Sequence, residues 1–336
     1  MSKTPKKITL LILSLLLTLA IAWFASFEFA KTRILQDFEK ELTHLKTQGY
    51  EISYDGISMS GSPLLVSAHI SNLKIKTPQN WGGGQTPLLT LSLRPWSLNH
   101  FYLDFEGDTH FDIPPFLNTT LLKLVCQNCK SEIWIENQNW NQIQISAHQI
   151  AFQNGEKTIP LTLSEINLDL ENNIIDHRIH LDFSSQLQGL DTALNLKGYT
   201  KSATFLFKSE ISHFQTPYPK TLAAWRDQGG IIDIKKLSFT WAPLDIQGDG
   251  TFTFDEQMRP LSAFSATISG YDRALEVLTE VGVIKKKAAQ MAGFILGMLA
   301  HQNQKGEKEI TVPITTQNGK LSVGPADLIE LEPIRP

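Results

Sequence analysis

The 336-residue sequence has few cysteines, few charged residues and no basic excess, and each shortage excludes a class of protein. Two cysteines cannot build a disulfide-dense scaffold. Charged residues make up 19% and apolar residues 42%, a balance that fits neither a disordered chain nor a polytopic transporter. The net charge of −4 argues against a nucleic-acid-binding protein, so we expect no nucleic acid as a partner.

Known catalytic and cofactor motifs are also absent from the sequence. It has no G-x-S-x-G, no H-E-x-x-H, no dinucleotide fingerprint and no kinase motif set. The glycine run 82–84 is not followed by Lys-Ser or Lys-Thr, so it is no phosphate-binding loop. We therefore expect a protein that is not an enzyme and that holds no cofactor and no metal.

An uncharged apolar run stands near the N-terminus. Ile8 to Phe27 contains no charged residue, and about 20 helical residues span about 30 Å, the thickness of a bilayer core. Lys3, Lys6 and Lys7 precede the run, so the positive-inside rule keeps the N-terminus in the cytoplasm and exports the remainder. This pattern predicts a single-pass inner-membrane protein whose C-terminal part is periplasmic. A cleaved signal peptide is the alternative, because Ala20-Ile21-Ala22 resembles a cleavage site.

A helical pattern follows the apolar run, and strands follow the helix. Ile34, Phe38 and Leu42 have helical spacing, which predicts an amphipathic helix that Gly49 ends. From Tyr50 the period changes to two, which predicts strands with one apolar and one polar face. The predicted organisation is a cytoplasmic N-terminus (1–7), a transmembrane anchor (8–27), a juxtamembrane helix (28–48) and a β-rich periplasmic domain (49–336).

The β-rich part predicts a mainly β fold with helical additions (α+β). More than ten alternating runs are separated by turn signals such as Asn154-Gly155 and Asn318-Gly319, which is typical of a large curved antiparallel sheet. Short helical patterns interrupt the strands at 218–228 and at 271–301, the second with a break at Gly282. Its second half, from residue 288 to 300, is apolar on nearly every side, so we expect it to be buried and packed on the sheet.

Two segments of the chain resemble one another. Residues 57–66 align with residues 237–246, and both read as a strand, a Pro-Leu turn and a return strand. This similarity predicts two related β units, at about 50–217 and 230–336. Unrelated hairpins of the same geometry would give the same pattern.

Cys126 and Cys129 form the single cysteine pair. In an oxidising compartment a disulfide between them is the default expectation. Free thiols and redox catalysis remain as alternatives, although the residues that follow read as a strand and not as the helix that activates a thiolate. A zinc site would need two further ligands from His100, His110 or His148.

Acidic side chains alternate along a segment further upstream. They share one face of a possible strand with a tyrosine and a histidine: Tyr102, Asp104, Glu106, Asp108, His110 and Asp112. Such a row predicts either an ordinary solvated face or a site for calcium or a basic partner. If the protein were an enzyme, this row is where we would look first.

Several motifs resemble those of the alphaproteobacterial envelope family called domain of unknown function 2125. The motifs are Gly49-Tyr50-Glu51-Ile52-Ser53-Tyr54-Asp55, Ser60-Gly61-Ser62-Pro63, the segment 237–244 with Gly248-Asp249-Gly250, and the ending Val312-Pro313-Ile314 with 317–321 and Gly324-Pro325. Ser62 stands where the family has an aromatic residue. The resemblance implies a membrane-anchored envelope protein and assigns no activity. The chain is similar, more distantly, to AsmA-like envelope proteins, whose curved sheets enclose lipid grooves.

A large one-sided apolar sheet needs something to cover it, since water does not tolerate so large an apolar patch. We therefore expect a groove for a lipid or another apolar ligand. The predicted groove residues are Leu237, Phe239, Ile246, Phe252, Phe254, Phe294 and Met298. The alternative function is that of a structural or assembly factor of the cell envelope, which would dock partner proteins through edge strands.

Overall fold

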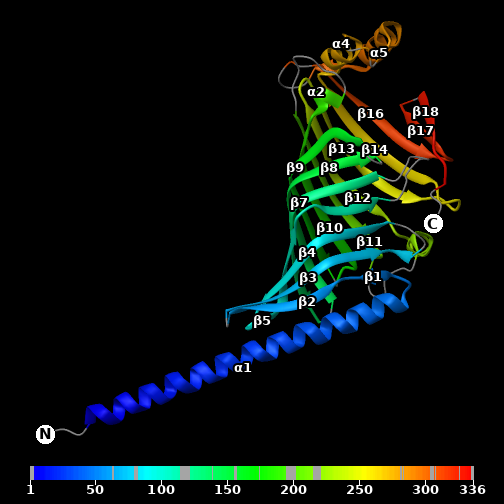
Figure 1. Cartoon of the computed structure of the whole chain (residues 1–336). Helices are drawn as coiled ribbons and strands as arrows, with labels where there is room; N and C mark the ends of the chain where they lie inside the picture. The colour runs from blue at the N-terminus through cyan, green and yellow to red at the C-terminus, as the bar shows by residue number, and fades with distance from the viewer. Residues whose placement is uncertain are drawn as a thin grey trace.

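The structure is a computed structural model that describes residues 4–62, 64–78, 82–113, 122–137, 139–154, 157–173, 175–193, 202–214, 221–280, 282, 284–302, 306, 308–324 and 326–333. One large antiparallel sheet dominates it, with a long N-terminal helix at one end and two short helices at the other (Figure 1). The predicted mainly β fold with helical additions is therefore confirmed.

The described chain contains five helices and 18 strands. The helices are α1 (Thr4–Thr47), α2 (Leu190–Ala193), α3 (Leu222–Asp227), α4 (Tyr271–Glu280) and α5 (Lys286–Leu299). The first nine strands are β1 (Glu51–Ser53), β2 (Gly56–Ser62), β3 (Leu65–Lys76), β4 (Gly83–Arg94), β5 (Ser97–Glu106), β6 (Thr109–Ile113), β7 (Leu122–Glu136), β8 (Asn139–Asn154) and β9 (Lys157–Asn173). The others are β10 (Arg178–Gln188), β11 (Ser202–Ser212), β12 (Ile232–Trp241), β13 (Leu244–Phe254), β14 (Pro260–Ser269), β15 (His301–Gln302), β16 (Lys308–Gln317), β17 (Lys320–Val323) and β18 (Ala326–Glu330).

Helix α1 is continuous and joins the predicted anchor to the predicted juxtamembrane helix. It ends where expected: Gly49 has φ +91°, its N–H donates to the Lys46 carbonyl at 3.1 Å, and the Tyr50 N–H donates to the Leu45 carbonyl at 3.1 Å. A glycine tolerates this left-handed conformation, which stops the helix and satisfies its last carbonyls.

The C-terminal half of α1 packs on the first strands of the sheet. Phe27 and Ile34 are buried in one cluster with Val66, Ala68 and Leu93. A second cluster continues along the helix and contains Leu42, Ile52, Ile70, Leu73 and Leu89. The N-terminal half of α1 projects beyond the sheet (Figure 1).

The strands pair as a meander, and each described pairing is antiparallel. Residues directly opposite one another share a face of the sheet. The registers therefore join the alternating apolar residues of successive strands into continuous rows, such as Ile133–Ile143–Leu170–Leu181 across β7, β8, β9 and β10. One apolar face thus runs from α1 toward the C-terminal helices.

A line of irregularities crosses the first half of this sheet. Residues with positive φ lie at matching heights on alternate strands: Asn72, Gly107, Asn128 and Glu165. Gly107 lies in a bulge, because three residues separate the ladder pairs on β5 and β6 where two separate them on β7. At Asn72, Asn128 and Glu165 the ladder to a neighbouring strand omits one residue pair without a shift in register, and the left-handed backbone there changes which face the following side chains occupy. This explains why the apolar spacing becomes three in β7 and β9, where Cys126 and Cys129 share a face, as do Leu163 and Ile166.

The C-terminal helices break near Gly282, as predicted, with φ +79° at this glycine. Helix α4 buries Ala274 and Val277 against Ala203 and Trp241. The expectation that residues 288–300 are buried on all sides is wrong, because only one face of α5 packs on α4 and β16 and no other described element covers the opposite face.

The two similar segments both form hairpins, β2–β3 and β12–β13. The strands of both hairpins belong to the same continuous meander. That the chain consists of two related β units stays a prediction. Helix α3 begins at Leu222, and residues 218–220 of the helix predicted over 218–228 lie outside the described residues. Pro63 of the first similar segment also lies outside them.

Candidate functional site

The middle of the apolar face is the main candidate site, and we call it the central apolar face. Its side chains are all partly exposed: Ile133, Ile143, Ile145, Leu168, Leu170, Leu181, Phe183, Phe205, Phe207 and Leu237. The described helices contact the sheet elsewhere. Helix α1 packs on β1 and β3, α2 on the ends of β9 and β11, α3 and α4 on β13, and α5 on β16. Helices α2 and α4 reach only the ends of β9 to β12, so no described helix packs on the middle of the strands from β7 to β12.

Three phenylalanines form the aromatic part of this face. Phe183 lies opposite Phe207 in the register of β10 and β11, and its ring centroid is 5.8 Å from that of Phe205. Phe207 in turn lies opposite Leu237 on β12. Aromatic side chains at such spacing offer a broad and rigid apolar surface.

The total accessible surface agrees with an incompletely covered sheet. The chain exposes 21213 Å², whereas a compact monomer of 37.7 kDa exposes about 14,000 Å² by the usual scaling with mass. The projecting half of α1 and the open sheet both contribute to this excess.

The structure brings five of the seven predicted groove residues together on β12 and β13. Phe239 lies opposite Ile246, and Leu237 lies opposite Gly248 on the same face. Two of the five are covered by helices: Phe239 packs in the cluster that α4 closes, and Phe254 packs on Trp225 of α3 with a centroid distance of 6.3 Å. Phe252 packs beside Phe254 at 5.2 Å. The predicted groove residues therefore lie at the edge of the central apolar face and not in its middle.

The other two predicted groove residues lie apart from these five. Phe294 and Met298 are on the outward face of α5, where 69% and 66% of their surfaces are exposed. Phe183, Phe205 and Phe207 were missed by the sequence analysis. Their alternation was visible in the sequence, but only the register of β10 and β11 reveals that they adjoin one another.

Exposed apolar side chains also gather where α1 leaves the sheet. The Trp23 ring lies 5.7 Å from the ring of Trp96, at the tip of the β4–β5 hairpin. Leu64 and Leu65, at the tip of the neighbouring β2–β3 hairpin, are exposed as well. Phe27 is already buried against the sheet, so the projecting length of α1 ends near Trp23 rather than at residue 27.

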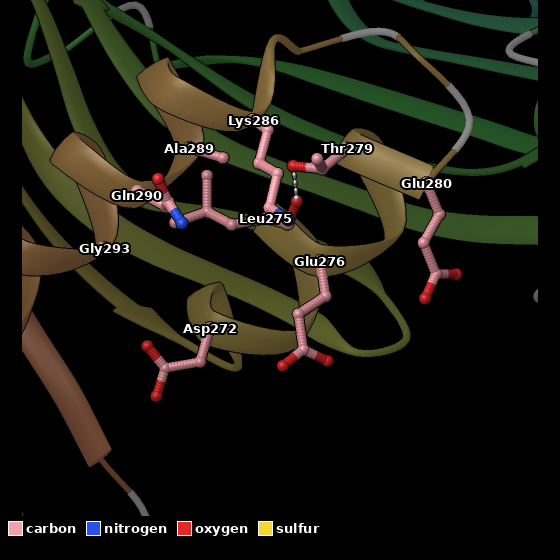
Figure 2. A pocket seen from close by; sticks show the side chains of 9 residues that line it. All are labelled: Asp272, Leu275, Glu276, Thr279, Glu280, Lys286, Ala289, Gln290 and Gly293. Atoms are coloured by element: carbon pink, nitrogen blue, oxygen red, sulfur yellow. Dashed lines mark hydrogen bonds between the residues drawn. The ribbon is translucent and has the colours of Figure 1, made fainter.

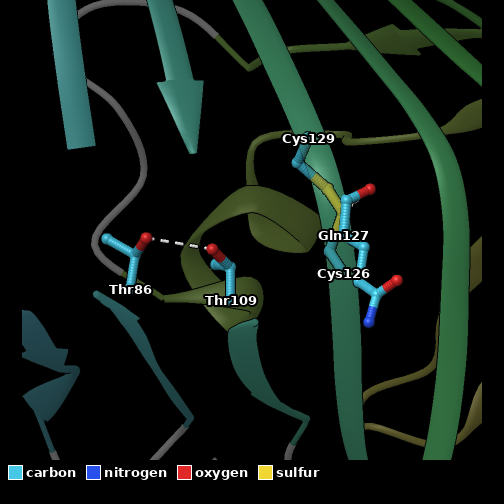
Figure 3. Close-up of a disulfide and its surroundings, with 5 residues drawn as sticks. All are labelled: Thr86, Thr109, Cys126, Gln127 and Cys129. Carbon is cyan, nitrogen blue, oxygen red and sulfur yellow. Dashed lines mark hydrogen bonds between the residues drawn. A yellow bond between two sulfur atoms is a disulfide. The ribbon is translucent and has the colours of Figure 1, made fainter. Parts of the chain in front are cut away.

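A disulfide joins Cys126 and Cys129 within β7, on the two sides of the positive-φ residue Asn128 (Figure 3). Both cysteines are buried, together with Ala147 and Ile166. Beside them the Thr109 hydroxyl donates to the Thr86 hydroxyl at 2.9 Å. Because each sulfur is bonded to the other, this pair acts as a structural cross-link within β7.

The acidic row is divided between β5 and β6, with a turn at Gly107. Two of its carboxylates have partners on β7: Lys130 lies 3.5 Å from Asp104, and the Gln127 amide donates to Asp108 at 3.0 Å. Asp112 Oδ1 is buried and has no hydrogen-bond partner within the described residues. Within the described ranges, no three His, Cys, Asp or Glu side chains assemble a group that could hold a metal ion. The row is arranged like an ordinary polar outer face.

An open cavity of about 630 Å³ lies between α4 and α5 (Figure 2). Its lining consists of Asp272, Leu275, Glu276, Thr279, Glu280, Lys286, Ala289, Gln290 and Gly293. The Thr279 hydroxyl is used within the helix, since it donates to the Leu275 carbonyl at 2.6 Å. Nearby, burial and the charge of Asp272 raise the pKa of Tyr271, so its phenol stays neutral at physiological pH.

The described part of the chain thus defines a class: mainly β proteins with a large open antiparallel sheet and one long N-terminal helix. Within that part, α1 is long and apolar enough to cross a membrane, a property that anchors and signal sequences share. A family model described as an uncharacterized protein conserved in bacteria, domain of unknown function 2125, matches residues 23–332, and the chain belongs to this family.

The family match confirms the resemblance found in the sequence motifs. Neither a curated protein nor a solved structure matches the chain. The more distant similarity to AsmA-like proteins stays a prediction.

Proposed function

We propose that this protein is a membrane-tethered envelope protein, without catalytic activity of its own, whose central apolar face holds the acyl chains of a lipid. The observation that carries the proposal is the row of partly exposed apolar side chains from β7 to β12, which no described helix covers. A lipid chain stabilises such a face by about 0.8 kcal/mol for each buried methylene group.

Three observations support the proposed location in the inner membrane with the sheet in the periplasm. The lysines before the apolar run favour an N-terminus in the cytoplasm. The Cys126–Cys129 disulfide is typical of an oxidising compartment. Trp23, Trp96 and the exposed hairpin-tip leucines fit the interface of the bilayer, where tryptophan is enriched.

The proposal is tested with two neighbouring residues of β11 that point to opposite faces. Phe205 lies on the central apolar face, whereas Leu206 lies on the polar face opposite Ser184 and Ser238. The full chain is purified in mild detergent, and a fluorescent fatty acid is titrated into wild type, F205E and L206E. We expect at least a tenfold loss of affinity for F205E, because the variant places a charge beside the buried chain, and little change for L206E.

Copurifying lipid gives a second measurement. Native mass spectrometry of the wild-type chain should show bound lipid mass that F205E loses and L206E keeps. A wild-type chain that carries no lipid and binds no fatty acid contradicts the proposal.

Protein docking is the second candidate function. The meander ends in strands that are paired on one side only within the described residues, β18 at one end and the β1–β2 pair at the other. Such edges can accept a strand from a partner. Crosslinking that captures one stable envelope partner at these edges, with no lipid in the purified complex, would favour this function over lipid binding.

A further inference from the structure

Helix α5 has two apolar faces, and only one of them is packed. The packed face consists of small residues and one leucine, at positions that recur with helical spacing: Ala289, Ala292, Gly293, Leu296 and Ala300. The opposite face carries bulky side chains with exposed fractions of 60% at Met291, 69% at Phe294, 45% at Ile295, 66% at Met298 and 49% at Leu299. This stripe of apolar side chains remains exposed to solvent in the folded chain. Exposed apolar patches of this kind mark interaction surfaces.

Positive charge accompanies this stripe. Lys285, Lys286 and Lys287 are exposed at the beginning of α5, and residues 281–300 contain no Asp or Glu. Lys287 stands four residues before Met291, so it lies on the same side of the helix as the bulky stripe. Its long aliphatic stem can follow the apolar surface while its ammonium group remains in a polar layer.

We propose that α5 docks on the surface of a lipid bilayer that carries anionic headgroups. The outward stripe enters the boundary between headgroups and acyl chains, and Lys285 and Lys287 contact the headgroup phosphates. An apolar face next to lysines is the pattern of helices that lie in a membrane interface. Helix α5 lies at the end of the sheet opposite to α1, so the docking bilayer approaches from that end (Figure 1).

A second copy of the chain fits this surface less well. A standard protein interface buries about 800 Å² on each partner and needs a complementary surface. The exposed stripe is a convex row of five side chains on a helix of 14 residues, and it carries a lysine of equal charge in each copy. A bilayer needs no matching groove and offers the opposite charge.

The test uses the full chain with α1 held in a nanodisc of neutral lipid. Flotation then measures capture by acceptor vesicles of phosphatidylcholine, with or without phosphatidylglycerol. We expect vesicles that contain phosphatidylglycerol to capture the wild-type chain. The double variant F294S/M298S should lower this capture about tenfold. For K285E/K287E, capture should be the same with and without phosphatidylglycerol. The control is I175S, which removes a side chain that is 90% exposed on the β9–β10 turn and should not change capture.

Two results would overturn the proposal. Capture that is equal for wild type, F294S/M298S and K285E/K287E shows that α5 does not contact the vesicle. A wild-type chain that is dimeric in mass photometry, becomes monomeric in F294S/M298S and binds no vesicles assigns the stripe to a second copy. The fatty-acid titration of the same variants is independent, so the failure of one proposal leaves the other standing.

Discussion

The indole ring of Trp225 lies directly on Gly230, so closely that a Cβ atom on residue 230 would stand 2.3 Å from Cε2 of the ring. Trp225 is only 3% exposed, and its Nε1 donates to the Ser212 carbonyl at 2.7 Å. Its ring also packs edge-on against Phe254. The absence of a side chain at residue 230 therefore allows α3 to cover one end of the apolar face.

The variant G230A should destabilise the fold by about 1–3 kcal/mol, because the added methyl group forces a buried and hydrogen-bonded ring to move. Chemical denaturation followed by tryptophan fluorescence measures this change in the free energy of unfolding. G56A is the matched control: a Cβ on Gly56 meets nothing within 4 Å, and the variant should change stability by less than about 0.5 kcal/mol. Equal effects of the two substitutions would show that the contact with Trp225 is unimportant.

Removal of the disulfide in C126A/C129A should lower the free energy of unfolding by about 2 kcal/mol. The cross-linked loop is short, since the two cysteines are three positions apart, and the loop-entropy relation gives a modest value for so short a loop. Thermal unfolding with and without reductant checks this value. Reductant should destabilise the wild type and leave the variant unchanged, and a wild type that is insensitive to reductant while unfolding contradicts the assignment.

Acid should weaken the turn between β13 and β14. Burial raises the pKa of Asp255, but hydrogen bonds from the Arg259 N–H and guanidinium and from the Gln257 N–H lower it more, so its pKa lies below the usual value of an aspartate. A lowered pKa in the folded state means that the carboxylate stabilises the fold above the unfolded-state pKa, and that this contribution is lost as pH falls through the folded-state pKa.

The variant D255N should therefore be less stable than wild type at neutral pH, by about 1–3 kcal/mol, since a charged hydrogen-bond acceptor is lost. This difference should shrink as pH falls below about 4. Denaturant titrations at several pH values measure the difference directly. A gap that is constant from neutral to acidic pH would mean that the charge of Asp255 contributes nothing.

Charges placed in the projecting half of α1 should release the protein from membranes. Leu16 and Leu17 are exposed on the helix, and each arginine at the centre of a membrane helix costs about 2.5–3.5 kcal/mol. We expect L16R/L17R to fail in membrane insertion and the conservative variant L16I/L17I to remain in the pellet after alkaline carbonate washing. The intact mass of the wild-type chain in that pellet distinguishes an uncleaved anchor from a cleaved signal peptide.

Local periodicity was sufficient to predict the extended strands, the termination of α1 at Gly49 and the break at Gly282. Each of these features depends on residues that are close in sequence, because alternation and left-handed glycines act locally. The prediction that the face including Leu237, Phe239 and Ile246 is apolar followed from the same alternation.

The sequence could not reveal which rows of side chains adjoin one another. The contact between Phe183 and Phe205 depends on the register of two strands, and the interruption of the ladder at Asn128 is visible only when the pairing of β7 with β8 is known. Helix α5 was expected to be buried because all its faces are apolar. Whether a further element covers its outer face depends on the tertiary fold, which the sequence of the helix does not reveal. For that reason the sequence analysis assigned Phe294 to an interior groove.

The order of strand pairing has a consequence for how such a chain can evolve. Each strand from β8 to β14 pairs only with its two neighbours, so inserting or deleting one whole hairpin leaves every remaining ladder intact. Relatives of different size can therefore retain both end helices while the distance between them grows or shrinks by the width of two strands, about 9.5 Å for each hairpin. In this architecture the distance between the two end helices can therefore change during evolution in steps of one hairpin, without changes to the core of the remaining sheet.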